Sequence, residues 1–337
     1  MIEDRRSILD YPQFDSHFSG YNQRQDGSMS TSHIEQGTVV RHPKKPEWGL
    51  GKVLAIEGDV AKIHFKDDSG PDYRAIRTDI VSLVRADVQS DPVLDNLPPF
   101  VGDQFEVKAI RVTFGNGVER FNHLFPLGFR DPKYLSQEAL AEGEAGGERD
   151  YKWNAHERFS EALGDGKAGT LLASGEIGEL VDRVCRAADI NLLSIYERSA
   201  IKEGLRADEG SARSYLSAVF EFIECGPEQR SFRAMAQALC NLPIAKGRAR
   251  AATWPVLTLF PYLADPTRFM FLKPEPTKEC AARLRFDLKY DSSLEWETYA
   301  RLMILSEQLL ERLHPLGARD FIDVQSFMWV VSKYPAS

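Results

Sequence analysis

The sequence lacks the features of a membrane or secreted protein. No run of about 18 uncharged apolar residues occurs among its 337 residues, so no segment is long and apolar enough to span a bilayer. The N-terminus, MIEDRRSILDYPQF, has no apolar signal core. The four cysteines include no C-x-x-C pair. We therefore expect reduced thiols, a cytoplasmic location and no membrane partner.

Complete catalytic and metal-binding motifs are also missing. The chain has no G-x-x-x-x-G-K-[ST] phosphate loop and no G-x-S-x-G nucleophile motif. The histidines of the larger part, His123, His156 and His314, are scattered, and no cysteine–histidine group has the spacing of a zinc site. The sequence therefore predicts no cofactor and no metal, and it favours a protein that is not an enzyme.

The composition is that of a folded chain with an acidic balance. Hydrophobic residues make up 43% of the sequence, enough to bury a core, and the length suggests two domains. Lys and Arg number 42 against 50 Asp and Glu, a net charge of −8. This charge argues against a protein that coats nucleic acid, but it leaves room for a local basic face.

The N-terminal quarter contains a polar segment followed by a small β region. Residues 1–35 are rich in Ser, Gln, Asp and Gly, which predicts a flexible tail, with Met29 as an alternative start. Residues 36–85 hold about five short β-like runs separated by turn residues. Because so few strands cannot make a sandwich, we expect them to curl into a small SH3/Tudor-like barrel.

Alternation is clearest in the third of these runs. Ala61, Ile63 and Phe65 share one face of the predicted strand. Lys62 and His64 share the other face, which we expect to face solvent.

The rest of the chain is expected to be a linker and a mainly helical domain. Residues 86–99 are acidic and carry prolines, as linkers do, and residues 100–335 form the predicted helical domain. A β-hairpin is expected at its entry, with Asn116 and Gly117 after a strand-like run that begins at Phe105. Residues 138–149 are rich in Ala, Glu and Gly and predict an exposed insertion. The fold class is therefore α+β and multidomain.

Helical periodicity begins near residue 150. Ser194 and Glu197 form one capping-box pattern, and Ser292 and Glu295 form a second that should open the longest helix. Asp320 should cap the last helix. Apolar residues recur at helical spacing in five segments: Ile177, Leu180, Val181 and Val184; Leu216, Val219, Phe220 and Ile223; Phe232, Met235, Ala236 and Leu239; Tyr299, Leu302, Leu305, Leu309 and Leu313; Phe321, Val324, Met328 and Val331.

A family resemblance is confined to residues 36–85. A strand ending in V-x-H-P, a loop to W-G-x-G and a second strand resemble the small Tudor/SH3-like domain of bacterial superfamily 1 DNA helicases. The same pattern is similar to the RNA-polymerase-interacting module of the CarD and transcription-repair coupling factor families. The positions that carry the resemblance are Val40, His42, Pro43, Trp48, Gly49, Gly51, Phe65, Arg74 and Leu83.

The resemblance implies a docking module that uses a strand edge and a few side chains. We expect it to bind RNA polymerase, a helicase, a defence-complex subunit or nucleic acid. The candidate binding residues are Arg41, His42, Lys44, Lys45, Trp48, Lys52 and Arg74. The chain departs from the helicase pattern because the module stands near the N-terminus with no motor attached, so helicase activity does not carry over.

Each candidate has a structural alternative. Trp48 is either an interface anchor or a cover for one end of the barrel. For His42, a hydrogen bond that stabilises the turn is favoured over a phosphate or carboxylate contact. Residues 36–85 carry nine basic and seven acidic residues, for which a mixed solvated surface is favoured over a phosphate-binding face. A methyl-lysine cage of Trp48, Phe65 and Tyr73 is disfavoured because Phe65 lies on the apolar face.

Two clusters in the helical domain allow a binding role. The first is polar and aromatic and would stack on bases or grip phosphates, although packing of an irregular loop on the helices is favoured. Its members are Asn122, His123, Arg130, Lys133, Tyr134, Arg149, Tyr151, Lys152, Trp153 and His156. The second is the basic run Lys246 to Arg250, for which a solvated turn is favoured.

Two functional hypotheses follow. The first is a non-catalytic bacterial accessory protein of nucleic-acid metabolism or defence, which docks through its small barrel. The second is a metal-dependent nuclease or defence effector with its site in the helical domain. For that alternative, Asp287 and Lys289 form a D-x-K pattern of the kind found in nucleases, a pattern that is also common by chance.

Overall fold

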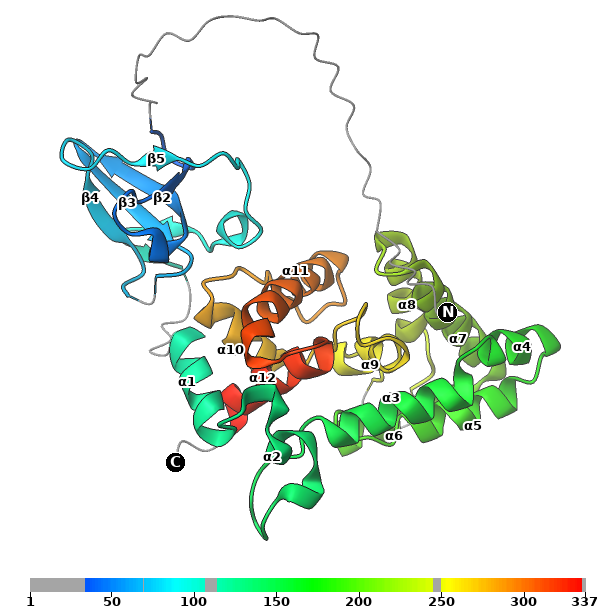
Figure 1. The fold of residues 1–337 in the computed structure, drawn as a ribbon. Coiled ribbons are helices and arrows are strands. Elements are labelled where there is room, and N and C mark those ends of the chain that lie inside the picture. Colours follow the sequence, from blue (N-terminus) through cyan, green and yellow to red (C-terminus); the bar gives the residue numbers. More distant parts are fainter. Residues whose placement is uncertain (1–33, 69, 107–113, 245–249, 335–337) are drawn as a thin grey trace, which may run out of the picture. The chain divides into compact units, whose positions relative to one another are not determined.

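The computed structural model describes residues 34–68, 70–106, 114–244 and 250–334 of the chain. The predicted tail of residues 1–35 therefore lies almost wholly outside the described residues. Every element below belongs to residues 35–337, and the chain is α+β (Figure 1). An antiparallel sheet comes first along the chain and a helical body follows it.

The N-terminal sheet has five strands in the order β4-β3-β2-β1-β5, with every neighbouring pair antiparallel. Within residues 34–68 and 70–106 no pairing joins β4 to β5, so strand pairing does not show the closure of a barrel. A two-stranded hairpin, β6–β7, follows. The strands are β1 (Val39–Arg41), β2 (Leu50–Glu57), β3 (Val60–Phe65), β4 (Arg74–Arg77), β5 (Val84–Arg85), β6 (Phe100–Val101) and β7 (Gln104–Phe105).

Strand β3 is buried on both of its faces, which corrects the expectation that Lys62 and His64 face solvent. The β6–β7 hairpin covers this second face. The Phe105 ring lies 5.4 Å from the His64 ring, and Asp103 lies 2.5 Å from the Lys62 ammonium. Residues 100–105 were expected to enter the helical domain, but these contacts belong to the sheet.

The segment 86–99, expected as a linker, also packs on the sheet. Leu94 is fully buried and forms an apolar cluster with Val39 and Leu50. The segment contains a 3-10 turn, Leu94–Asn96, which Asp91 stabilises. The Asp91 carboxylate accepts hydrogen bonds from the Val93 and Leu94 amides at 2.9 and 3.1 Å. Apolar burial and local capping thus give this acidic segment a fixed place against the sheet.

Gly51 lets β2 approach the β3 side chains closely. A Cβ atom at Gly51 would lie 2.5 Å from Phe65 Cδ1 and 2.8 Å from Ile63 Cγ2. We expect Gly51→Ala to lower the free energy of unfolding by about 1–3 kcal/mol, because the two side chains must leave their packed positions. Urea denaturation measures this. The control is Gly169→Ala, which has open space around its Cβ position inside a helix and should not destabilise.

The helical body runs from residue 114 to residue 333. All five predicted apolar stripes are buried or partly buried in its core. Its α-helices are α1 (Phe114–Leu124), α2 (Pro132–Leu135), α3 (Asp150–Leu163), α4 (Lys167–Ser174), α5 (Ile177–Ala187), α6 (Ile195–Ala207), α7 (Glu209–Cys225), α8 (Gln229–Cys240), α9 (Trp254–Ala264), α10 (Pro274–Arg283), α11 (Trp296–Leu313) and α12 (Phe321–Lys333).

The helix-capping predictions have mixed outcomes. Ser194 and Glu197 form the predicted capping box at the start of α6, and Asp320 caps α12 through the Ile322 and Asp323 amides. The second predicted box is wrong, because α11 begins only at Trp296 and its N-cap is Glu295.

The predicted hairpin at Asn116-Gly117 is wrong, because both residues lie in helix α1. Residues 107–113, the rest of the expected strand, lie outside the described residues. Gly117 faces α12, where an added Cβ would lie 3.0 Å from Val331 Cγ1 and 3.5 Å from Phe327 Cζ. The glycine therefore serves close helix packing instead of a turn, and tertiary contacts override its local preference.

Helix α12 lies within the body and packs against α1, α10 and α11 (Figure 1). Residues 321–328 of this helix are all buried. A helix that is apolar all round belongs in a core, but this stretch also contains Asp323, Gln325 and Ser326. Each buried polar group needs a hydrogen-bond partner, so the groups around these three side chains decide their role.

Candidate functional sites

Trp48 packs at the edge of the sheet among three of the predicted positions. Its ring lies 5.0 Å from the His42 ring and 5.2 Å from the Phe65 ring. The Arg74 guanidinium lies 4.8 Å from the Trp48 ring centre, within cation–π range, and Asp68 holds it at 2.7 Å. Trp48 is half-buried. It therefore covers the Phe65 end of the core and keeps part of its surface open.

His42 accepts a hydrogen bond that stabilises the turn, the alternative favoured from the sequence. The Lys44 amide donates to His42 Nδ1 at 3.2 Å. Partial burial and then the neighbouring Lys45 lower the pKa of His42, which keeps this nitrogen neutral and able to accept.

Most of the basic side chains of the sheet are already paired with carboxylates. Lys45 lies 3.3 Å from Glu47 and Lys52 lies 3.1 Å from Asp95. Among the residues that the structure describes, no carboxylate lies within ion-pair distance of Arg41, Lys44 or Arg85. Further pairs within the sheet are Lys62 with Glu57 and Asp103, Lys66 with Asp91, Arg74 with Asp68, and Arg77 with Asp79. Basic and acidic side chains are therefore interleaved in ion pairs on this part of the chain.

The two polar residues buried on β3 are held by the covering segments. His64 Nδ1 lies 2.7 Å from the Asp72 carbonyl oxygen. Burial lowers the pKa of His64, although that hydrogen bond acts in the opposite direction, so His64 is neutral and donates to the carbonyl. Hydrogen bonds to Asp103 and Glu57 raise the pKa of Lys62. Both residues serve the fold of the sheet.

The nuclease candidates Asp287 and Lys289 are used in local contacts. The Asp287 carboxylate accepts a hydrogen bond from the Lys289 amide at 3.0 Å, and the Lys289 ammonium lies 2.8 Å from Glu297. Within the described ranges, no group of three or more His, Cys, Asp or Glu side chains is arranged to hold a metal ion. No observation therefore favours cleavage chemistry at this position.

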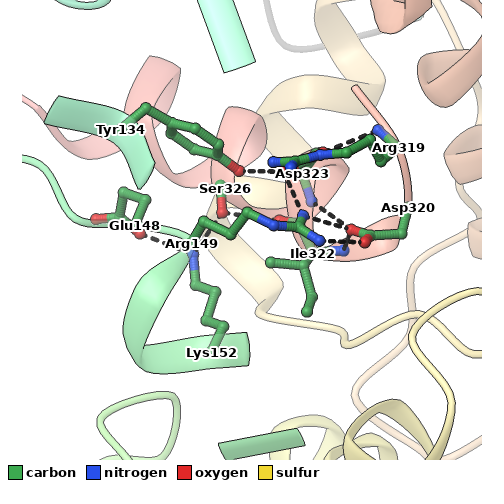
Figure 2. Close-up of polar contacts among 9 residues, drawn as sticks. All are labelled: Tyr134, Glu148, Arg149, Lys152, Arg319, Asp320, Ile322, Asp323 and Ser326. Carbon is green, nitrogen blue, oxygen red and sulfur yellow. Dashed lines mark hydrogen bonds and ion pairs between the residues drawn. The ribbon is translucent and has the colours of Figure 1, made fainter. Parts of the chain in front are cut away.

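A buried polar network joins α12 to the start of α3 (Figure 2). Arg149 donates to Asp320 at 3.0 and 2.6 Å and to Asp323 at 2.7 Å. Tyr134 donates to the same Asp323 oxygen at 2.5 Å, and Arg319 binds the other oxygen through its amide at 2.8 Å. Asp323 is completely buried and has partners on both of its oxygens.

The second half of the network centres on Lys152. This fully buried ammonium donates to Glu148 at 2.7 Å and to the Ser326 hydroxyl at 2.8 Å. Ser326 in turn donates to the Ile322 carbonyl at 2.7 Å. Tyr334 donates to the other Glu148 oxygen at 2.6 Å.

Burial and neighbouring charges shift the pKa values of the basic and phenolic groups in this network. Burial alone would lower the pKa of Arg149, but hydrogen bonding to Asp320 and the charge of Asp323 raise it. Burial and the Asp323 charge raise the pKa of Tyr134, so the phenol keeps its proton and donates. Burial lowers the pKa of Lys152, while Glu148 acts against this shift. Two buried cations, Arg149 and Lys152, thus face three buried carboxylates in a low-dielectric interior, so removal of one charge would leave its partner uncompensated.

The network is structural, because its charged groups are paired with one another and closed off from solvent apart from Arg319. Within the predicted exposed insertion at residues 138–149, residues 138, 139 and 141–145 are exposed, whereas Glu148 and Arg149 at its end are buried. The network also shows that Tyr134, Arg149 and Lys152 of the polar-aromatic cluster serve packing. From sequence, Asp323 was missed; the only signal was an acidic residue inside an apolar helix. Of the basic run Lys246 to Arg250, residues 246–249 lie outside the described residues.

Comparison with known proteins gives one match. Residues 34–85 match the family DUF3553, described as a protein of unknown function. No curated protein and no solved structure matches the chain. The match covers the five-stranded sheet and does not extend to the β6–β7 hairpin or the helical body. Across the described residues, no helix combines the length and apolar character needed to cross a membrane.

Proposed function

We propose that this chain is a non-catalytic bacterial accessory protein of nucleic-acid metabolism or defence, and that its small sheet docks onto a protein partner. RNA polymerase and a helicase are the proposed partners, because residues 36–85 resemble SH3/Tudor-like docking modules of those systems. The observation that supports docking is the exposed edge strand β5, together with the exposed apolar residues that lie next to it in the chain.

The edge surface combines apolar and basic groups. Ile80, Val84 and Val88 have exposed fractions of 68%, 52% and 45%. β5 pairs with β1 on one side, and among the described residues no strand pairs with its other side. Arg41 lies directly opposite Val84 in this pairing, and among the described residues it has no acidic partner. An extended partner segment with acidic side chains fits such an edge by strand addition.

A protein is favoured over nucleic acid by the charge arrangement. Binding to a phosphate backbone requires many free cations, and six of the nine basic residues between 36 and 85 are in ion pairs with carboxylates of the sheet region or of residues 86–99. Three remaining basic residues are enough to select an acidic rim on a protein.

Binding of the full chain to separate purified probes tests the proposal. The probes are bacterial RNA polymerase core, a superfamily 1 helicase, and single- and double-stranded DNA, each followed by biolayer interferometry. We expect binding to one of the two proteins, weakened at least tenfold by Ile80→Asp with Val84→Asp. The matched control is Ile56→Asp, which is also exposed but lies at the end of β2, away from β5, and should bind normally. Binding to neither protein, or to DNA alone, would show the proposal to be wrong.

A further inference from the structure

Gln325 is the exception among the polar residues buried in α12. Asp323 and Ser326 have hydrogen-bond partners in the network, whereas Gln325 is only 3% exposed and its Oε1 atom has no partner among the described residues. An unpaired buried amide oxygen is costly, and a leucine at this position would avoid the cost. The Gln325 Oε1 atom is therefore available to accept a hydrogen bond from a molecule outside the chain.

Gln325 lines a cavity of about 110 Å³. The cavity is several times larger than one water molecule needs, but smaller than the usual pocket for a drug-sized ligand. It therefore has room for a single small ring system. Its lining includes the aromatic residues Tyr151, Phe271 and Trp329 and the polar residues Asn191, Lys273 and Gln325.

The lining residues have suitable chemistry for a flat ring with polar edges. Gln325 and Trp329 are one helical turn apart on α12, so they share a face of that helix. Aromatic side chains stack on heteroaromatic rings, and side-chain amides pair with the donors and acceptors on the ring edges. An apolar ligand would leave the Gln325 oxygen unpaired. The ammonium of Lys273 is already engaged by the Leu192 carbonyl at 2.9 Å and lies 3.7 Å from Glu197.

We propose that this cavity binds a nucleobase, with the Gln325 amide pairing with the edge of the base and the aromatic lining stacking on its face. The base belongs either to a free nucleotide or to a single strand. The site is built from the helical body alone, so it does not depend on the docking proposed for the sheet. The polar network keeps it in place, because Tyr151 adjoins Glu148 and α12 carries both Ser326 and Gln325.

Titration of the full chain with AMP, GMP, CMP, UMP and a 12-nucleotide single-stranded DNA tests this site. Calorimetry measures affinity, and tryptophan emission reports stacking. We expect saturable binding of at least one probe and quenching that is reduced in Trp329→Phe. A mononucleotide that binds identifies free nucleotides as a source, and binding of the oligonucleotide alone identifies a strand; either result supports the site.

The decisive variant is Gln325→Leu. We expect it to weaken base binding at least tenfold while its melting temperature stays the same or rises, because the unpaired amide is gone. Gln237→Leu, an exposed glutamine on α8, is the control and should bind like the original chain. Failure of all probes to bind at millimolar concentration, or unchanged affinity in Gln325→Leu, would leave the cavity as a water-filled space and overturn the proposal.

Discussion

Asp323→Ala is expected to lower the free energy of unfolding by about 3–5 kcal/mol. The substitution removes the buried carboxylate that accepts hydrogen bonds from Arg149, Tyr134 and the Arg319 amide. Arg149 then keeps only Asp320 as a buried counter-charge, and the Tyr134 hydroxyl loses the carboxylate that accepts its hydrogen bond. Urea denaturation followed by circular dichroism gives the change in free energy.

The control for this prediction is Glu157→Ala, an exposed acidic residue on α3. Its effect should stay within about 0.5 kcal/mol, as for most surface substitutions. A loss of less than about 1 kcal/mol in Asp323→Ala would show that the network contributes little as a buried charge cluster.

Lys152→Met is expected to cost about 3–5 kcal/mol although methionine fills a similar space. The ammonium is the buried counter-charge of Glu148, which would keep only the hydroxyls of Tyr334 and Tyr151 as donors. The same urea denaturation experiment measures the loss of free energy of unfolding.

A double-mutant cycle distinguishes the charge effect from packing. Glu148→Gln combined with Lys152→Met should be less destabilised than the sum of the two single changes, because no uncompensated buried charge remains. If the two effects simply add, the pair is not coupled, and packing alone accounts for the loss.

Local patterns predicted the elements well where one face of an element is buried. The five apolar stripes and the Ser194 capping box depend only on residues within a few positions of one another, and both are present. The wrong capping box at Ser292 was itself a local pattern, whereas the wrong hairpin came from contacts distant in sequence. Asn116-Gly117 has a strong turn preference, but packing of Gly117 against α12 places it in a helix.

The candidate sites show the same contrast between local patterns and contacts distant in sequence. His42 and Trp48 lie close together, as a local motif allows. The partners of Arg149, by contrast, are about 170 residues away on α12, and no periodicity relates them. A buried aspartate or glutamine inside an apolar helix is a usable sequence signal of a polar environment, but only the tertiary fold shows whether that side chain contacts another side chain or lines a cavity.

The β6–β7 hairpin has a practical consequence for work on the small sheet in isolation. The family match ends at residue 85, so a polypeptide trimmed to that boundary would lose the Phe105 ring from above His64 and the Asp103 carboxylate from Lys62. It would also lose Leu94 from its apolar cluster. Recombinant fragments of the small sheet should therefore run to residue 106, so that His64 and Lys62 keep the groups that cover them.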